Sequence, residues 1–267
     1  MAFGIMLIRS VLKEVEQREK LEILTKKLEN ANAKLRELDR LKSEFLSFAS
    51  HQVKAPMAVV KGFATLIYDG TYGPVSDQIR ETAHKIKDSA DRMITLVNNI
   101  LNLRKIEEGK MEYHFEEVNM VNLTRQMLEE LKPLADNKTL TLTLEGEVTE
   151  AMVRADVEKF RQVLQNLIEN AIKYTERGWV KVVLEKTASS LLIKISDSGR
   201  GLSEELISRL FERFNRDEAV AKKIEGTGLG LYIAKQIILA HQGEVWAESL
   251  GKEQGSLFTV KIPLLSN

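Results

Sequence analysis

The chain has 267 residues, which is long enough for two modest domains that each bury a hydrophobic core. Lys plus Arg and Asp plus Glu number 39 each, so the net charge is zero, and aromatic residues make up only 6%; this composition argues against a nucleic-acid partner. Cysteine is absent, which excludes disulfides and thiolate metal sites and is compatible with a reducing cytoplasm.

The first segment, MAFGIMLI, is apolar but much shorter than the roughly 20 residues that a membrane-spanning helix needs. It has no basic n-region and no small-residue cleavage site, so it does not have the pattern of a signal peptide. Two interpretations stay open. Residues 1–9 are either the remaining stub of a transmembrane helix or the frayed start of an ordinary helix.

A long helix is predicted from about Leu12 to Tyr68, where Pro56 and Gly62 are the only proline and glycine. Within residues 1–40 the apolar residues recur in steps of three and four, with Glu and Lys at most positions between them, which predicts a coiled coil. After that repeat, one step of three replaces a step of four shortly before His51, and such a slip disturbs supercoiling locally. The repeat consists of Leu21, Leu24, Leu28, Ala31, Leu35 and Leu38.

His51 lies in the segment FLSFASHQVKAPM, shortly before Pro56. On an ideal helical wheel it is roughly 100° from the centre of the apolar stripe, so its side chain is predicted to be accessible. Pro56 cannot donate a hydrogen bond to the carbonyl of Gln52, which predicts a kink beyond the histidine. A lone histidine in a helix says little, so its meaning depends on the motifs that follow.

The segment DGTYGPVSD, residues 69–77, predicts a turn, and apolar residues at helical spacing predict a second helix up to residue 108. Residues 41–108 are therefore predicted to form a helical hairpin. Its apolar faces exceed what two helices can cover, which favours dimerisation into a four-helix bundle. The alternative is a hairpin that packs against its own second domain.

In residues 109–267 short strands alternate with helices, which predicts an α/β (α+β) two-layer sandwich: a mixed sheet with helices on one face. The whole chain would then be an all-α coiled coil and hairpin followed by this domain. Strands are predicted at 111–118, 140–147, 152–156, 179–186, 191–197, 243–249 and 256–263, and helices at 119–137, 157–174 and 231–240.

Asn166, Asn170 and Lys173 are spaced so that they share one face of the predicted helix at 157–174. An amide oxygen is a suitable ligand for Mg²⁺, a lysine can bind phosphate, and Tyr174 can lie against a nucleotide base. Taken alone, these residues are more typical of an ordinary solvated helix face.

Asp197 ends an apolar strand, where its carboxylate can accept a hydrogen bond from an exocyclic amine such as adenine N6. Gly199 and Gly201 would allow the backbone to approach a flat ligand closely. An ordinary turn after a strand is the alternative.

The segment GTGLG, residues 226–230, precedes an apolar helix and offers exposed N–H groups and a positive dipole end to phosphate. It has neither the Walker spacing nor a Rossmann fingerprint, and a glycine-rich loop alone is a weak indication. Residues 211–225 are polar with two phenylalanines, which predicts a mobile lid.

In this order the motifs resemble the N box, the DxGxG box, the F-like segment and the GxGLG box of sensor histidine kinases, and FLSFASHQVKAPM resembles their H box. The resemblance runs from about residue 41 to 263 and extends to the ATP-binding fold of gyrase, Hsp90 and MutL. It implies that His51 is the phosphoacceptor, that Asn170 holds Mg²⁺, and that Asp197 recognises adenine. The implied ATP-binding residues are Asn166, Asn170, Lys173, Tyr174, Asp197, Gly199, Gly201, Arg216, Gly226, Thr227, Gly228, Leu229 and Gly230.

The resemblance further implies a homodimer that passes its phosphoryl group to an aspartate on a response-regulator receiver domain. The stimulus would reach it from an upstream sensor domain outside this sequence. The chain would then be the cytoplasmic portion of a bacterial sensor, membrane-anchored if residues 1–9 are a transmembrane stub.

Three positions bear on its activities. Asn166 stands where the related ATPases have the glutamate that activates water, which argues against a simple ATPase, although Glu169 lies nearby. The commonest H box, HELRTP, has an acidic residue and a Thr or Asn where this chain has Gln52 and Ala55. Gln52 can orient the imidazole but cannot take its proton, and Ala55 cannot position water. The sequence therefore predicts autophosphorylation with weak phosphatase activity, the alternatives being a gyrase- or Hsp90-type ATPase and an inert nucleotide-sensing scaffold.

The other histidines, His84, His114 and His241, are expected to be structural or surface residues without acidic or histidine partners at ligand spacing.

Overall fold

The computed structural model describes residues 2–215 and 227–265 and divides into two compact units, residues 1–97 and 98–267. In the described part of the chain, no helix has the length and apolar character needed to cross a membrane. The elements are α1 (Ala2–Tyr68), α2 (Asp77–Glu107), β1 (Glu116–Asn119), α3 (Met120–Asp136), β2 (Thr141–Glu145), β3 (Met152–Ala155), α4 (Val157–Tyr174), β4 (Trp179–Lys186), β5 (Ser190–Asp197), α5 (Glu204–Arg209), α7 (Gly230–Ala240), β6 (Glu244–Glu248) and β7 (Ser256–Pro263).

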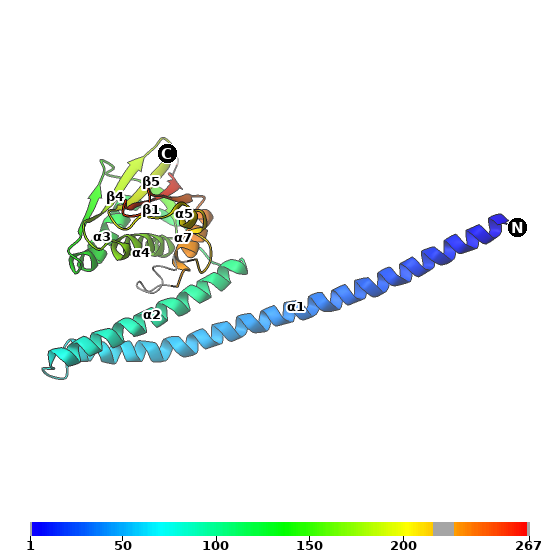
Figure 1. Ribbon diagram of the computed structural model, residues 1–267, viewed down its shortest axis with the longest axis horizontal. Helices are drawn as coiled ribbons and strands as arrows, with labels where there is room; N and C mark the ends of the chain where they lie inside the picture. The colour runs from blue at the N-terminus through cyan, green and yellow to red at the C-terminus, as the bar shows by residue number, and fades with distance from the viewer. Residues whose placement is uncertain (1, 216–226, 266–267) are drawn as a thin grey trace. The chain divides into compact units, whose positions relative to one another are not determined.

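The first unit contains the predicted long helix and the start of the second helix (Figure 1). Helix α1 has 67 residues and continues through Pro56 without a break in its helical structure. The predicted turn follows, where Gly70 and Gly73 adopt positive φ angles of 71° and 115° that suit glycine. The hairpin prediction is therefore confirmed.

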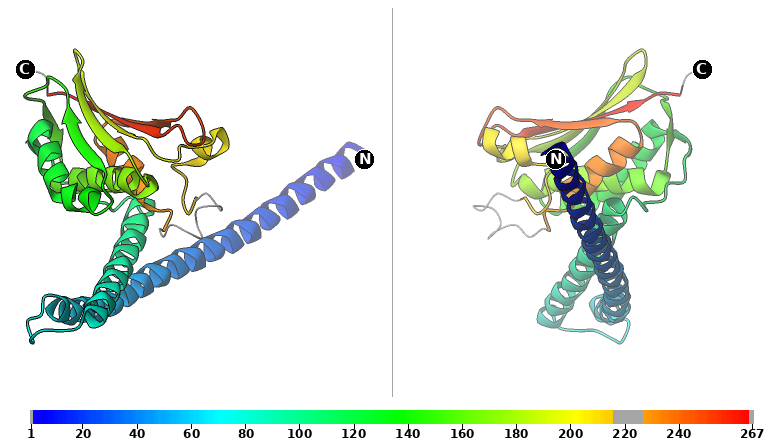
Figure 2. Two further views of the ribbon diagram at one scale, coloured as in Figure 1. Left: turned by 60° about the vertical axis from the view of Figure 1, so that its left-hand side comes forward. Right: turned by 90° about the vertical axis from the view of Figure 1, so that its right-hand side faces the viewer.

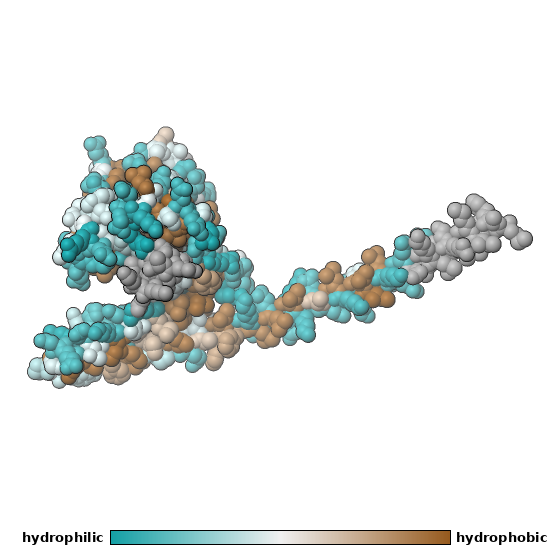
Figure 3. All heavy atoms as spheres, viewed as in Figure 1, coloured by the Kyte–Doolittle hydropathy of each residue, from teal (hydrophilic) through white to brown (hydrophobic). Residues whose placement is uncertain are grey.

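Contacts between the two helices of the hairpin include an ion pair and a pair of rings, those of Tyr68 and His84, whose centres lie 5.3 Å apart. Ala64 of α1 and Ala83 and Ala90 of α2 are buried, and the Nζ of Lys61 lies 2.6 Å from the carboxylate of Asp91. From Leu21 onward, where the side chains of α1 are described, most large apolar residues of this helix remain exposed within one chain, and they gather along it in Figure 3. They include Leu21, Leu24, Leu28, Leu35, Leu38, Leu41, Phe45, Phe48, Val59 and Phe63.

The second unit is the predicted α/β sandwich. Its five-stranded sheet has the order β2-β4-β5-β7-β6, in which β2 and β4 are parallel and the other pairs are antiparallel. The sheet is therefore mixed, and helices α3, α4 and α7 lie against one of its faces (Figure 2). The last turns of α2 also contribute to this unit, because Ile100, Leu103 and Ile106 pack on its core.

The prediction of a strand over residues 111–118 is wrong for its first half. Strand β1 begins at Glu116 and forms a separate two-stranded sheet with β3. Residue His114 does not continue the strand because its backbone N–H donates to the carboxylate of Asp156 at 2.8 Å. That bond joins residues 42 positions apart, so local alternation could not reveal it.

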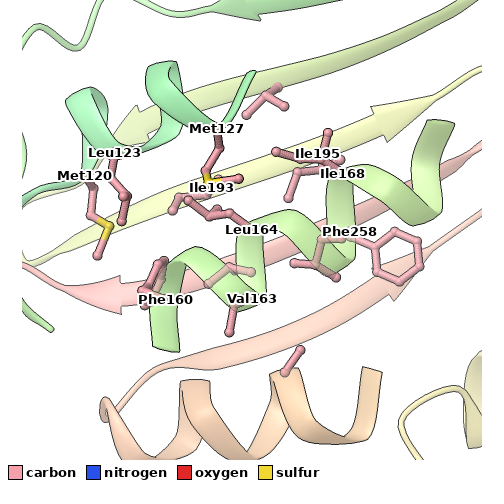
Figure 4. Packing of buried hydrophobic residues seen from close by; sticks show 14 of the residues in the cluster. Met120, Leu123, Met127, Phe160, Val163, Leu164, Ile168, Ile193, Ile195 and Phe258 are labelled. Atoms are coloured by element: carbon pink, nitrogen blue, oxygen red, sulfur yellow. The ribbon is translucent and has the colours of Figure 1, made fainter. Parts of the chain in front are cut away.

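Helix α4 is the centre of the core. Its apolar residues, among them Phe160, Leu164 and Ile168, are fully buried between the sheet and the neighbouring helices (Figure 4). Asp156 caps the helix, since its side chain accepts from the N–H of Lys159 at 3.0 Å. Full burial of three such side chains contributes on the order of 5 kcal/mol or more.

A buried histidine fastens the start of α4 to the end of α7. The Nδ1 of His241 donates to the carbonyl of Ile237 at 2.7 Å, and its Nε2 accepts from the backbone N–H of Asp156 at 2.9 Å. The rings of Tyr113, Phe115 and Phe160 surround the imidazole. Burial lowers the pKa of His241, and the Ile237 carbonyl and the Asp156 charge only partly offset this effect. The folded chain therefore holds a neutral imidazole.

This geometry predicts that the fold loses stability in mild acid. In the unfolded chain His241 takes up a proton near its ordinary pKa of about 6.5, but the folded chain resists protonation, so stability falls as pH drops below about 6.5. Urea unfolding at pH 7.5 and 5.5 should show a larger loss of stability for the wild type than for His241→Gln. The exposed His114 is the control: His114→Gln should behave like the wild type, and identical pH dependence in His241→Gln would contradict the assignment.

Candidate functional site

The polar face of α4 forms one side of the candidate site. Asn166, Asn170, Lys173 and Tyr174 are all partly exposed, whereas the residues between them on the inner face are buried. The Nζ of Lys173 lies 5.9 Å from the centre of the Tyr174 ring. Asn166, Asn170 and Lys173 therefore share a face of α4 that does not pack into the hydrophobic core.

Asn166 packs against the beginning of α7. A Cβ added to Gly230 would lie 2.3 Å from the Oδ1 of Asn166, so a larger residue there would displace the Asn166 side chain. The Nδ2 of Asn166 is buried and has no hydrogen-bond partner among the residues that the structure describes. An unsatisfied buried amide is costly, and a bound polar ligand is one way to satisfy it. Two motifs more than 60 residues apart are thus brought together.

Asp197 ends β5 and is 5% exposed. Its Oδ1 accepts from the N–H of Gly199 at 2.8 Å, and its Oδ2 accepts from the hydroxyl of Ser256 on β7. Burial raises the pKa of the Asp197 carboxyl, and the hydrogen bonds from Ser256 and Gly199 only partly offset this effect. A carboxylate has about four acceptor positions, so capacity remains for a donor from a ligand.

The glycines beside Asp197 permit close backbone approaches. A Cβ at Gly199 would lie 2.5 Å from the carbonyl oxygen of Tyr174 and 2.9 Å from the hydroxyl of Thr175. A Cβ at Gly201 would lie 1.9 Å from the carbonyl oxygen of Gly251. Side chains at these two positions would force the segment after β5 away from the end of α4 and from the loop before β7.

The glycine-rich segment lies at the start of α7. Its N-cap residue, Leu229, is buried and supplies no side-chain hydrogen bond, whereas the side chains of Asn119, Asp156 and Ser203 cap α3, α4 and α5. The N-cap side chain of α7 therefore does not occupy the backbone N–H groups of the first turn. Such N–H groups at a helix N-terminus can bind phosphate. The hydroxyl of Thr227 accepts from the N–H of Leu229 at 3.2 Å.

The described part of the predicted lid is joined to this loop. The N–H of Phe214 donates to the carbonyl of Gly228 at 3.0 Å, and the Phe214 side chain is 66% exposed. Arg213 binds the hydroxyl of Tyr232 at 3.1 Å and also pairs with Glu107 at the end of α2. Sequence reasoning missed this link because its members come from three distant segments. Arg216 and Gly226 lie outside the described residues.

The segment that contains His51 lies in the first unit. His51, Gln52 and Ala55 are all exposed, as the helical wheel predicts for the histidine. One expectation about the other histidines is wrong: the Nδ1 of His84 lies 3.0 Å from the carboxylate of Asp88, one turn later. The i, i+4 spacing in the sequence could have revealed this pair.

The residues present are compatible with Mg²⁺. Among the described residues there is no cluster of three His, Cys, Asp or Glu side chains that could hold a metal by itself. Mg²⁺ usually retains waters, binds one or two protein ligands and bridges to substrate phosphates. The partly exposed Asn170, one turn from Asn166, suits such a site, where the ion would neutralise phosphate charge.

Two families match this chain. Residues 41–109 match the His Kinase A (phospho-acceptor) domain, and residues 155–266 match the family described as histidine kinase-, DNA gyrase B- and HSP90-like ATPase. The chain is 33% identical over 243 residues to the circadian input-output histidine kinase CikA of Synechococcus elongatus, which covers 90% of this chain but 32% of that protein.

Solved structures agree with this assignment. Full-length ShkA in complex with AMPPNP has a TM-score of 0.68 at 26% identity, covering 84% of this chain and 46% of that one. The complex of the histidine kinase ThkA with the response regulator TrrA has a TM-score of 0.56 at 25% identity, covering 83% of this chain and 61% of that one. The chain belongs to the sensor histidine kinases, of which it contains the phosphoacceptor and the ATP-binding domains.

Proposed function

We propose that this chain binds ATP with Mg²⁺ in its second unit, transfers the γ-phosphoryl group to His51, and passes it on to an aspartate of a response-regulator receiver domain. The observation that carries the proposal is the exposure of His51 within the phosphoacceptor segment. The AMPPNP complex of ShkA and the complex of ThkA with TrrA support the nucleotide and the receiver partner by similarity.

In the proposed reaction an unprotonated ring nitrogen of His51 attacks the γ-phosphorus. An N–P bond forms, the bond from phosphorus to the bridging oxygen breaks, and ADP leaves. Gln52 orients the imidazole by a hydrogen bond. In this proposal the Asp197 carboxylate accepts a hydrogen bond from the N6 amine of adenine, Lys173 and Arg216 bind phosphate oxygens, and Asn170 would hold Mg²⁺.

The first unit is proposed to form a homodimer. A single chain leaves the heptad leucines of α1 exposed, with Leu28 at 67% and Leu35 at 64%. A second copy with the same stripe would cover them as a coiled coil that continues into a four-helix bundle. This pairing removes large apolar surface from water, which a single hairpin cannot do.

The ATPase alternative is disfavoured by the residues around Asn170. Asn166 cannot act as a general base, and it packs against Gly230. The carboxylate of Glu169 accepts a hydrogen bond from the amide of Gln165 at 2.7 Å. That bond directs Glu169 along the surface of its own helix, and Asn166 offers no base at the position where the related ATPases have glutamate, so we expect the phosphoryl group to be retained for His51.

The first prediction concerns the phosphoacceptor itself. Incubation with [γ-³²P]ATP and Mg²⁺ should label the wild type with acid-labile, alkali-stable phosphate, because phosphohistidine has that stability. His51→Gln should carry no label, and Asn170→Ala should lose nearly all of it through loss of the metal ligand.

The exposed His114 provides the matched control, so His114→Gln should be labelled like the wild type. Labelling that persists in His51→Gln would contradict the proposal. Absence of label in the wild type, with nucleotide binding intact, would favour the inert scaffold, and release of phosphate without a labelled protein would favour the ATPase.

A second prediction concerns the reverse activity. Ala55 has no hydroxyl or amide to position water, so the wild type should leave a phosphorylated receiver domain no less stable than the receiver is alone. Ala55→Thr should accelerate dephosphorylation severalfold. The assay is repeated with His51→Gln. In this variant the receiver cannot transfer its phosphoryl group back to His51, so any loss of phosphate is hydrolysis. Rapid dephosphorylation by the wild type that disappears in Gln52→Ala would contradict this expectation.

A third prediction tests the dimer by analytical ultracentrifugation. Leu28→Lys introduces a charge into the apolar stripe of each copy and should weaken self-association about a hundredfold, since burial of each leucine is worth about 1.5–3 kcal/mol. Ala33→Lys adds the same charge on the outward side of the repeat and should associate like the wild type. Equal association of both variants would show that this stripe is not the interface.

A further inference from the structure

Lys138 binds the end of helix α4 from a distant part of the chain. Its Nζ lies 3.0 Å from the carbonyl oxygen of Ile172, 2.9 Å from that of Lys173 and 3.2 Å from that of Thr175. The last carbonyls of a helix have no partners within the helix and carry the negative end of its dipole. An ammonium group has three donors, so one side chain satisfies three acceptors here.

The backbone of Lys138 is itself held in place. It follows α3, and its N–H donates to the carbonyl of Ala135 at 3.0 Å. The next residue, Thr139, has a positive φ of 57°, and Leu140 also donates to Ala135, which closes the turn before β2. Burial lowers the pKa of the Lys138 ammonium, and the charge of Glu176 partly offsets this effect.

The segment that Lys138 holds is also a wall of the nucleotide site. A Cβ at Gly199 would meet the carbonyl of Tyr174 at 2.5 Å, the Oδ1 of Asp197 at 2.8 Å and the hydroxyl of Thr175 at 2.9 Å. The N–H of Arg200 approaches the same Tyr174 carbonyl at 3.4 Å. Gly199 in turn donates its N–H to the carboxylate of Asp197 at 2.8 Å. A continuous set of contacts thus leads from Lys138 to Asp197.

We propose that Lys138 is a positioning residue for adenine recognition: it holds the last turn of α4 where Tyr174 and Thr175 support Gly199, and thereby orients Asp197. This inference rests on the proposed function, in which Asp197 recognises adenine. Without the ammonium, three carbonyls lose their donor, the last turn of α4 loosens, and Gly199 loses its support. The Asp197 carboxylate then keeps its charge, but its orientation is no longer fixed.

The test compares ADP with GDP, which bind without phosphoryl transfer. In Lys138→Met the affinity for ADP should fall about tenfold while the weak affinity for GDP changes little, so the preference for adenine falls about tenfold, or about 1.4 kcal/mol. Dissociation constants are measured by calorimetry well below the thermal midpoint of each variant. The backbone amide resonance of Gly199 should also shift in this variant.

Two further variants separate positioning from stability. Lys132→Met removes a lysine of α3 that makes an exposed ion pair with Asp136 at 3.2 Å, and it should keep the wild-type preference. Lys138→Arg retains the charge and donors and should recover most of the preference. If Lys138→Met does not fold, Lys138→Gln, which keeps a neutral donor, is measured in the same way.

A variant at position 138 that melts at a lower temperature but keeps the wild-type preference for ADP would overturn the proposal, because the residue would then be purely structural. A wild-type chain that binds ADP no better than GDP would instead remove the assignment of adenine to Asp197, and the proposal with it. The two failures are distinguished by the wild-type measurement alone.

Discussion

The pairing of β5 with β7 is the constraint on which the nucleotide site depends. Its register places Asp197 opposite Ser256, so the carboxylate is held by a hydroxyl from the neighbouring strand. The N–H of Gly255 donates to the carbonyl of Gly199 at 3.0 Å and draws the loop before β7 against the loop after β5. A slip of one residue would turn Asp197 to the other face of the sheet. The site is therefore specified by the same hydrogen bonds that build the fold.

Helix α4 connects that strand pair to the rest of the site. Its inner face is part of the core, so its outer face cannot rotate without exposing Phe160, Leu164 and Ile168. The helix is fixed at its start by Asp156 and at its end by Lys138, and both residues act on backbone groups. The polar residues between these ends need little further support to stay in place, which is the arrangement expected of a preorganised binding site.

Much of the fold could be predicted because its signals are local. The apolar period of α4 is readable in the sequence, and the structure has the bounds of α4 as predicted, but Asp156, predicted as the last residue of the preceding strand, caps the helix. Helix α7 begins at Gly230, one residue before its predicted start. The seven strands were also expected, but β1 was placed too early, because the donation from His114 to Asp156 replaces strand pairing there.

The candidate site was predicted in its motifs but not in its supports. Ser256 and Lys138 belong to no motif, and each acts on a residue far away in the sequence. Thr175 directly follows the predicted polar face of α4, but its approach to Gly199 comes from the tertiary fold. A lysine directly after a helix is typical of a solvated turn, and only the tertiary fold brings three backbone carbonyls within hydrogen-bond distance of Lys138. The pair of His84 with Asp88 is a different case. Its spacing of four residues is visible in the sequence, but His84 was expected to have no acidic partner at that spacing.

The central claim is that the phosphoryl group of ATP goes to His51 and not to water. It is tested most directly by one turnover in which phosphohistidine on the protein, identified by mass spectrometry at neutral pH, and free phosphate are counted in the same sample. The account predicts that phosphate on His51 accounts for nearly all the ADP formed, and that Asn166→Glu shifts the balance toward free phosphate. Free phosphate equal to ADP in the wild type, with no modification of His51, would contradict it.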